Sequence, residues 1–104
     1  MALVAEQKDP KTAEPRILAV GRLRKLHGTN DGEFAVLVSD EYQGRGLGIE
    51  LVRRLIEVAR AEKLSAIVGD VLQDNAVMRH ICETLGFTME GSIEDPVLKA
   101  EYKL

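Results

Sequence analysis

The fold of this chain is decided by residues 36–48, Val36-Leu37-Val38-Ser39-Asp40-Glu41-Tyr42-Gln43-Gly44-Arg45-Gly46-Leu47-Gly48. An apolar run typical of a buried strand is followed by a polar turn and then by a glycine-rich step into an amphipathic helix. The first N–H groups of a helix have no intrahelical partner and lie at the positive end of its dipole, where a phosphate can bind. Glycine lets a ligand approach the main chain because no Cβ stands in the way. The stretch therefore predicts a site for a pyrophosphate-bearing cofactor.

The spacing of the glycines excludes two of the three nucleotide-binding loops that use such a junction. A GxxxxGK[ST] loop needs Lys and Ser or Thr after its last glycine, but Ile49 and Glu50 follow here. A GxGxxG dinucleotide fingerprint begun at Gly44 or Gly46 would need its third glycine at Ile49 or Leu51. Neither loop fits the chain.

The third pattern, [Gln/Arg]-x-x-Gly-x-[Gly/Ala], is met in full by Gln43, Gly46 and Gly48. It resembles the coenzyme A pyrophosphate loop of the GNAT superfamily of N-acetyltransferases. The resemblance implies acetyl-CoA as cosubstrate, with its pyrophosphate held mainly by main-chain N–H groups of residues Gln43, Gly44, Arg45, Gly46, Leu47 and Gly48. The Arg45 side chain is expected either to reach a phosphate oxygen or to be solvated.

Length, charge and cysteine content limit the class of protein. The 104 residues suffice for one domain, and a net charge of −3 argues against nucleic-acid binding driven by overall charge. No run is long enough to span a bilayer, and the N-terminus lacks a signal-peptide layout. The single cysteine excludes an internal disulfide, and no second His or Cys stands at metal-ligand spacing. We expect one cytoplasmic domain over residues 1–104, with no nucleic-acid, membrane or metal partner.

Hydrophobic periodicity and turn residues predict a mixed α/β (α+β) fold in the order βββ-α-β-α-ββ. The sheet is expected to be mostly antiparallel and flanked by two helices. The expected strands are Met1–Glu6, Arg16–Leu26, Glu33–Val38, Ala66–Leu72, Thr88–Gly91 and Val97–Lys103; the helices run from 46 or 47 to Glu62 and, after a cap at Asp74 or Asn75, to Leu85.

This order looks like the core of the GNAT fold after its N-terminal helices, which commonly shape the acceptor site in the family. Residues 1–15 cannot supply those helices, so we expect a partial acetyltransferase domain that further sequence or another chain completes. Residues 33–38 look most like the acetyltransferase domain fused to acyl-CoA-synthetase-like modules in bacterial protein lysine acetyltransferases. That resemblance implies an amine acceptor, with a protein lysine as the candidate, and a fused synthetase-like domain or a homodimer as partner.

The family resemblance also implies roles for the strand that ends at Val38 and for Asn75. In the family this strand carries a bulge and parts from the strand after the helix, and the pantetheine arm pairs with the exposed main chain in the gap. Carried over by position, Val36 and Val38 supply those contacts. Asn75 matches a family position that contacts the pantetheine amide or the cofactor loop, and it can equally cap the second helix.

Glu33 is the candidate catalytic residue. A lysine ammonium must lose a proton before it attacks the thioester, and a carboxylate beside the cleft can take that proton, directly or through water, if burial makes it basic enough. In the lysine-acetylating enzymes that this chain resembles, a Glu on this strand has that role. The alternative is a solvated Glu that closes the turn at Gly32.

Cys82 departs from the family pattern. Many relatives have a Tyr here, ahead of Gly-Phe, to protonate the departing coenzyme A thiolate, whereas a Cys on an apolar helix face usually packs in the core. Solvent is then expected to protonate the thiolate. Two functions stay open: an acetyl-CoA-dependent N-acetyltransferase that uses Glu33 as general base, and a non-catalytic acyl-CoA-binding regulatory or interaction module of a larger protein.

Overall fold

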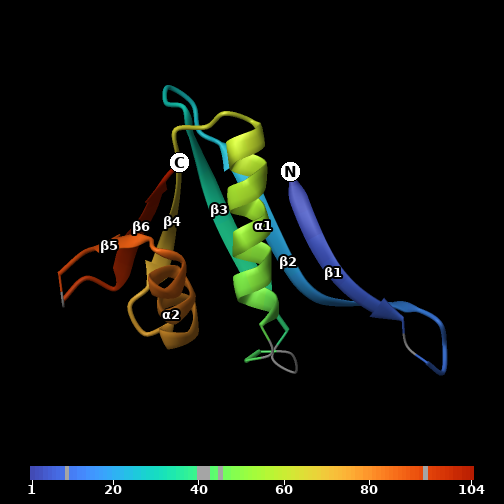
Figure 1. Ribbon diagram of the computed structural model, residues 1–104. Coiled ribbons are helices and arrows are strands. Elements are labelled where there is room, and N and C mark those ends of the chain that lie inside the picture. Colours follow the sequence, from blue (N-terminus) through green and yellow to red (C-terminus); the bar gives the residue numbers. More distant parts are fainter. Residues whose placement is uncertain (9, 40–42, 45, 93) are drawn as a thin grey trace.

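The computed structural model describes residues 1–8, 10–39, 43–44, 46–92 and 94–104. It contains one six-stranded sheet and two helices in the predicted order βββ-α-β-α-ββ, which confirms the expected fold class (Figure 1). The elements are β1 (Ala2–Lys8), β2 (Pro15–Lys25), β3 (Asp31–Val38), α1 (Leu47–Ala61), β4 (Ala66–Leu72), α2 (Ala76–Leu85), β5 (Thr88–Glu90) and β6 (Val97–Lys103). Among the described residues no helix has the length and apolar character that crossing a membrane requires.

The strands lie in the order β1-β2-β3-β4-β6-β5. The first three form an antiparallel meander, and β5 and β6 form a final hairpin. β6 also pairs with β4 and therefore lies between β4 and β5. Among the described strands, β3 and β4 alone pair in parallel, and the α1 crossover between them joins the two halves of the sheet.

β3 and β4 pair only at their first residues, from Asp31 opposite Ala66 to Glu33 opposite Val68. Beyond Glu33 the two strands part, which confirms the predicted gap (Figure 1). The bulge expected in this strand is absent, because the β2–β3 register runs unbroken from residue 32 to residue 38. The strands separate instead where the ring of Phe34 leans over β4 at Gly69, which has no side chain to meet it.

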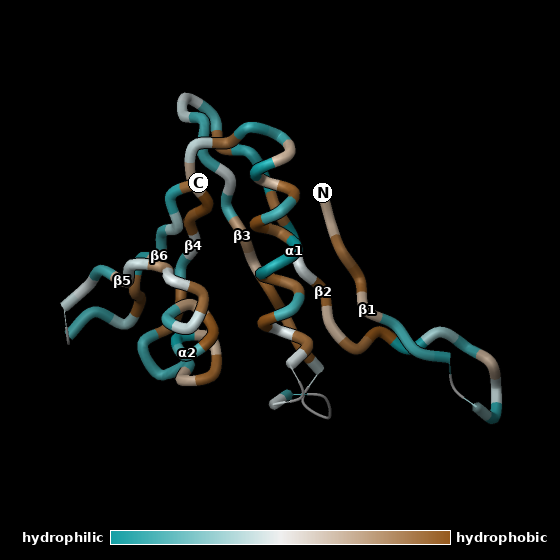
Figure 2. The backbone as a smooth tube through the Cα atoms, in the orientation of Figure 1, coloured by the Kyte–Doolittle hydropathy of each residue, from teal (hydrophilic) through white to brown (hydrophobic). Residues whose placement is uncertain are grey.

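Both helices pack in front of the same face of the sheet (Figure 1). α1 carries the predicted apolar stripe, and hydrophobic and hydrophilic residues alternate along the helix (Figure 2). The residues of α1 that are buried are Gly48, Leu51, Val52, Leu55, Ile56 and Ala59. The stripe joins Ile81 and Cys82 of α2 in one core, so the two helices are held side by side at the gap between β3 and β4.

The other face of the sheet is uncovered by any described helix. Side chains alternate along β3, so Phe34 is buried beneath the helices while Leu37, on the opposite face, is 78% exposed. Leu72 and Val4 are also exposed, at 56% and 49%. The sheet therefore has a helix-covered face and an open face that carries apolar side chains.

Candidate functional site

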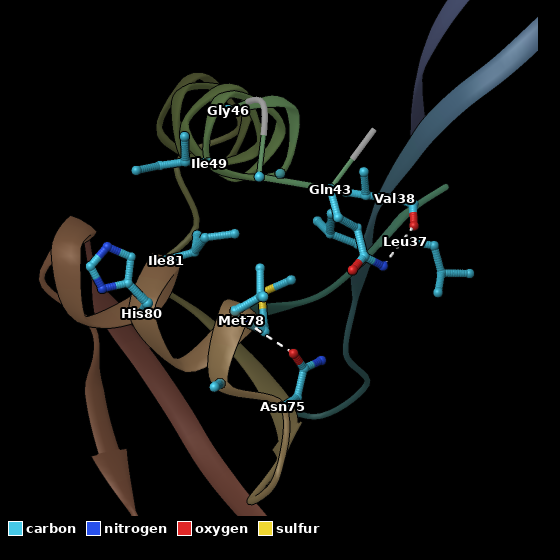
Figure 3. Close-up of a pocket in the computed structure, with 14 residues that line it drawn as sticks. Leu37, Val38, Gln43, Gly46, Ile49, Asn75, Met78, His80 and Ile81 are labelled. Atoms are coloured by element: carbon cyan, nitrogen blue, oxygen red, sulfur yellow. Dashed lines mark hydrogen bonds between the residues drawn. The ribbon is translucent and has the colours of Figure 1, made fainter. Parts of the chain in front are cut away.

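A cleft of about 590 Å³ lies where β3 and β4 part. β3 forms one wall, the glycine loop and the first turn of α1 form the second, and the first half of α2 forms the third (Figure 3). Most of the residues that the sequence predicts for the cofactor line it: Val36, Val38, Gln43, Gly44, Gly46, Gly48 and Asn75. The Leu47 side chain is not part of the lining, and Arg45 lies outside the described residues.

The edge of β3 offers its main chain to this cleft. The Ser39 N–H donates to the Leu18 carbonyl at 2.8 Å, and the Leu26 N–H donates to the Asp31 carbonyl at 2.9 Å. Along an antiparallel pair, every second residue hydrogen-bonds to the neighbouring strand through its main chain. Because Asp31 and Ser39 do so, the odd-numbered residues of β3 are the ones whose main-chain groups bond to β2. The main-chain groups of Val36 and Val38 consequently face the gap toward β4, in the place expected for contacts to an extended ligand.

The N-terminus of α1 is open to the cleft. Gly44 and Gly46 have φ angles of 78° and 84°, which favour glycine because a Cβ is strained there. Gly46 is the N-cap residue, and no side chain of the described residues caps the helix. The first intrahelical bond comes from the Glu50 N–H, so the preceding N–H groups, including that of Leu47, have no helical partner. These groups and the helix dipole create a site suited to an anion.

Gln43 ties the loop to the strand. Its Nε2 donates to the carbonyl oxygen of Val38 at 3.3 Å (Figure 3). The side chain of the motif glutamine thus bonds to the protein, and its position fixes the loop against the end of β3.

Asn75 begins α2 and confirms the capping prediction. Its Oδ1 accepts a hydrogen bond from the Met78 N–H at 3.1 Å (Figure 3), whereas Asp74 is not the cap. The Asn75 side chain also lines the cleft, so its amide N–H₂ group is available to a ligand while the oxygen caps the helix.

Several residues that the sequence did not predict also line the cleft: Leu37, Ile49, Ala76, Val77, Met78, His80 and Ile81. The apolar positions of α2 were interpreted only as core. Val77 is 51% exposed and faces the cleft. The apolar stripe of α2 is therefore wider than the part of it that packs in the core. This additional apolar position is the feature of the sequence that could have indicated that α2 lines a cleft.

Glu33 lies away from the cleft. It is on the open face of the sheet, in a second hollow of about 380 Å³ that also includes Asp70 and Glu90. Arg24, directly opposite on β2, donates to its carboxylate at 2.8 Å, and the Glu33 side chain is 42% exposed. The carboxylate is therefore ion-paired and partly solvated, which differs from the buried environment expected for a base.

Cys82 belongs to the core, as the sequence predicts, and is not part of the cleft lining. Burial, and to a lesser extent the neighbouring Glu83 carboxylate, raises the pKa of its thiol to about 11. A thiol in this position keeps its proton and has no route to a ligand in the cleft. Among the described residues no group of three or more His, Cys, Asp or Glu is placed to hold a metal ion.

The chain is similar to acetyltransferases of known sequence. The L-methionine sulfoximine/L-methionine sulfone acetyltransferase of Pseudomonas aeruginosa is 38% identical over 61 residues, which are 59% of this chain and 36% of that protein. The acetyltransferase Pat of Mycolicibacterium smegmatis is 39% identical over 64 residues, 62% of this chain and 19% of that protein. The chain spans well under half the length of these two relatives.

A solved structure shares the fold. The GNAT domain of S. lividans PAT is 29% identical and superposes with a TM-score of 0.76 over 89% of this chain and 56% of that chain. The model of the acetyltransferase (GNAT) family matches residues 3–87. Because this match runs through every wall of the cleft, from β3 to the end of α2, the chain belongs to the acetyltransferase (GNAT) family.

Proposed function

We propose that this chain binds acetyl-CoA in the cleft and transfers its acetyl group to an amine. One observation carries the proposal: beyond Glu33 the edge of β3 pairs with no described strand, and it lines the same cleft as the N-terminus of α1, which no described side chain caps. Pantetheine contains amide groups that pair with a strand edge, and pyrophosphate suits a helix N-terminus. The cleft volume of about 590 Å³ lies in the range of small-molecule sites.

Within this proposal, the two ends of the site have different tasks. The main chain of Val36 and Val38 holds the pantetheine arm, and the N–H groups of residues 43–48 hold the pyrophosphate. The Asn75 amide donates to the pantetheine arm beside them. A main-chain N–H near Val38 polarises the thioester carbonyl by stabilising the negative charge that develops on its oxygen.

The reaction is direct attack by the amine on the thioester. The amine nitrogen bonds to the carbonyl carbon, the carbon–sulfur bond breaks, and coenzyme A leaves as a thiolate that solvent protonates. Glu33 accepts the proton that the ammonium loses. Glu33 precedes Val36 by three residues, about 10 Å along a strand, so water must carry the proton between the amine and the carboxylate.

A protein lysine is the proposed acceptor. The likeness to Pat and to the GNAT domain of S. lividans PAT supports this choice, whereas the name of the Pseudomonas relative specifies small amino-acid derivatives. The exposed apolar residues Leu37 and Leu72 on the open face support a covering partner there. We propose a fused synthetase-like domain or a second copy of the chain for that role.

The test measures acetyl-CoA-dependent thiol release with lysine peptides. Glu33→Gln is expected to lower kcat about 100-fold at unchanged KM for acetyl-CoA, because proton transfer and not cofactor binding is impaired. Glu90→Gln, in the same hollow, is the matched control and should keep the parent rate. Equal rates for the parent and Glu33→Gln would remove the general-base role and leave the transferase.

The second candidate is a non-catalytic acyl-CoA-binding module. The burial of Cys82, at the position where many relatives have a proton-donating Tyr, favours it. Under this alternative the chain binds acetyl-CoA but releases no thiol with any amine acceptor. Turnover with a single acceptor would exclude it.

A further inference from the structure

The described residues that line the cleft include few ionisable groups. Of the 14 described residues that line it, His80 alone has a side chain that can carry a charge. Coenzyme A has a pyrophosphate and a separate 3′-phosphate on its ribose. The α1 N-terminus offers main-chain N–H groups to the pyrophosphate, and a separate donor among the described lining residues suits the 3′-phosphate.

His80 stands at the correct end of the cleft for that task. Figure 3 shows His80 and Ile49 at one end, Val38 and Gln43 at the other, and Gly46 between them. A ligand whose pantetheine arm lies along β3 and whose pyrophosphate lies at Gly46 therefore continues toward His80. The nucleotide part of coenzyme A, which follows the pyrophosphate, is then the part of the ligand that lies near the His80 imidazole.

Packing between the helices keeps His80 close to the first turn of α1. A Cβ built on Gly48 would lie 2.9 Å from Cδ1 of Ile81, so α2 touches α1 at the residue next to His80. His80 itself is exposed on the second turn of α2. Its ring is thus free to meet a group that extends out of the cleft.

The described cations on α1 are already engaged elsewhere. Arg53 and Arg54 both donate to the Glu50 carboxylate, at 2.9 and 3.1 Å. Arg60 donates to the Tyr102 hydroxyl at 2.9 Å, at the far end of the helix. None of the three lines the cleft.

We propose that His80 binds the 3′-phosphate of the cofactor and so makes the site prefer coenzyme A over ligands that lack this group. The proposal rests on the proposed cofactor site. Both ring nitrogens of a charged imidazole donate hydrogen bonds, and such charge-assisted bonds to phosphate are among the stronger ones. His80 acts here in binding and specificity, away from the reacting thioester.

Calorimetric titration of the purified chain with coenzyme A and with 3′-dephospho-coenzyme A tests this assignment. The parent should bind coenzyme A about tenfold more tightly than the dephospho form. His80→Asn should bind both about equally, having lost affinity for coenzyme A alone, and His80→Lys should restore the preference. His27→Asn is the matched control, because His27 is exposed in the turn between β2 and β3.

The possible results distinguish a failure of the His80 assignment from a failure of the cofactor site. A preference that is absent in the parent or kept by His80→Asn would overturn the assignment. An equal loss of affinity for coenzyme A and for the dephospho form in His80→Asn would also overturn it, because the imidazole would then contact a part of the cofactor that both ligands contain. If the parent binds neither ligand, the cofactor site itself fails and this inference falls with it.

Discussion

The ring of Phe34 on β3 lies over Gly69 on β4, so close that a Cβ on Gly69 would come within 2.6 Å of Phe34 Cε1. Gly69 is the first residue of β4 after its last pair with β3. The same ring packs against Phe87, with 5.3 Å between the ring centroids. The point where the strands part is therefore joined to the aromatic core.

Gly69→Ala is expected to destabilise the fold. The new methyl group must displace the Phe34 ring from a packed core, and such overpacking costs about 1–3 kcal/mol. Urea denaturation should show this as a lower midpoint with an unchanged slope.

Gly21→Ala is the matched control for this substitution. Gly21 is also a buried strand glycine, but its nearest neighbour would be Leu55 Cδ1 at 3.4 Å, an ordinary contact. In a Phe34→Leu background the cost of Gly69→Ala should shrink, because the shorter side chain leaves room. Equal midpoint shifts for the two alanine variants would refute the contact.

Gly48→Ala should weaken acetyl-CoA binding with little change in stability. Its Cβ meets Cδ1 of Ile81, the flexible end of a side chain that lines the cleft. Pushing that methyl group aside narrows the cleft, and we expect the Kd to rise about tenfold. Ile81→Val removes Cδ1, so it should restore binding in the Gly48→Ala background. Failure of this rescue would contradict the account.

Substitution of Asn75 separates its two roles. Asn75→Ala loses the cap and should cost about 1 kcal/mol of stability, while Asn75→Asp keeps an oxygen cap and should cost little. Neither variant can donate an amide N–H to the cofactor, so both should bind acetyl-CoA less tightly. Parent-like affinity in Asn75→Asp would mean that Asn75 only caps the helix.

Alkaline pH should destabilise the protein through Cys82. Burial first, and the Glu83 carboxylate second, raises the pKa of its thiol from 9.0 to about 11. In that window the unfolded chain releases the thiol proton and the folded chain keeps it. The free energy of unfolding therefore falls as the pH rises, by at most about 1.4 kcal/mol per pH unit from this group.

Cys82→Ala provides the reference for this effect, because all other titrating groups are shared with the parent. The stability advantage of the parent over this variant should be full at about pH 8 and smaller at about pH 10.5. Urea unfolding at both pH values measures it. If the stability difference between the parent and Cys82→Ala does not change with pH, the thiol has the same pKa in the folded and unfolded chains, which would contradict this prediction.

The parts of the fold that were predictable from the sequence follow local rules. The glycine loop, the apolar stripe of α1 and the Gly86 stop of α2 are each determined by neighbours a few residues away. The position of β6 between β4 and β5 depends on pairings distant in the chain, which periodicity does not encode. The bulge expected in β3 was carried over from the family resemblance, and the unbroken β2–β3 register shows that this strand lacks it.

The sequence predicted only part of the candidate site, because some lining residues are brought to it by contacts between elements distant in the chain. Val36 and Val38 follow from the strand and its register, but His80 and Val77 line the cleft only because α2 packs across the first turn of α1. The ion pair of Glu33 with Arg24 was within reach of the sequence. A hairpin with its turn between residues 26 and 31 sets these two side chains opposite one another.

Residue-resolved hydrogen exchange of β3, with and without acetyl-CoA, measures whether the cofactor pairs with the main chain of this strand. The N–H groups of Ala35 and Leu37 bond to β2, so they should be protected in both samples. Those of Val36 and Val38 face the gap, and they should exchange rapidly in the free chain and become protected when acetyl-CoA is added. Unchanged exchange at Val36 and Val38 under saturating acetyl-CoA would contradict a cofactor bound along this strand.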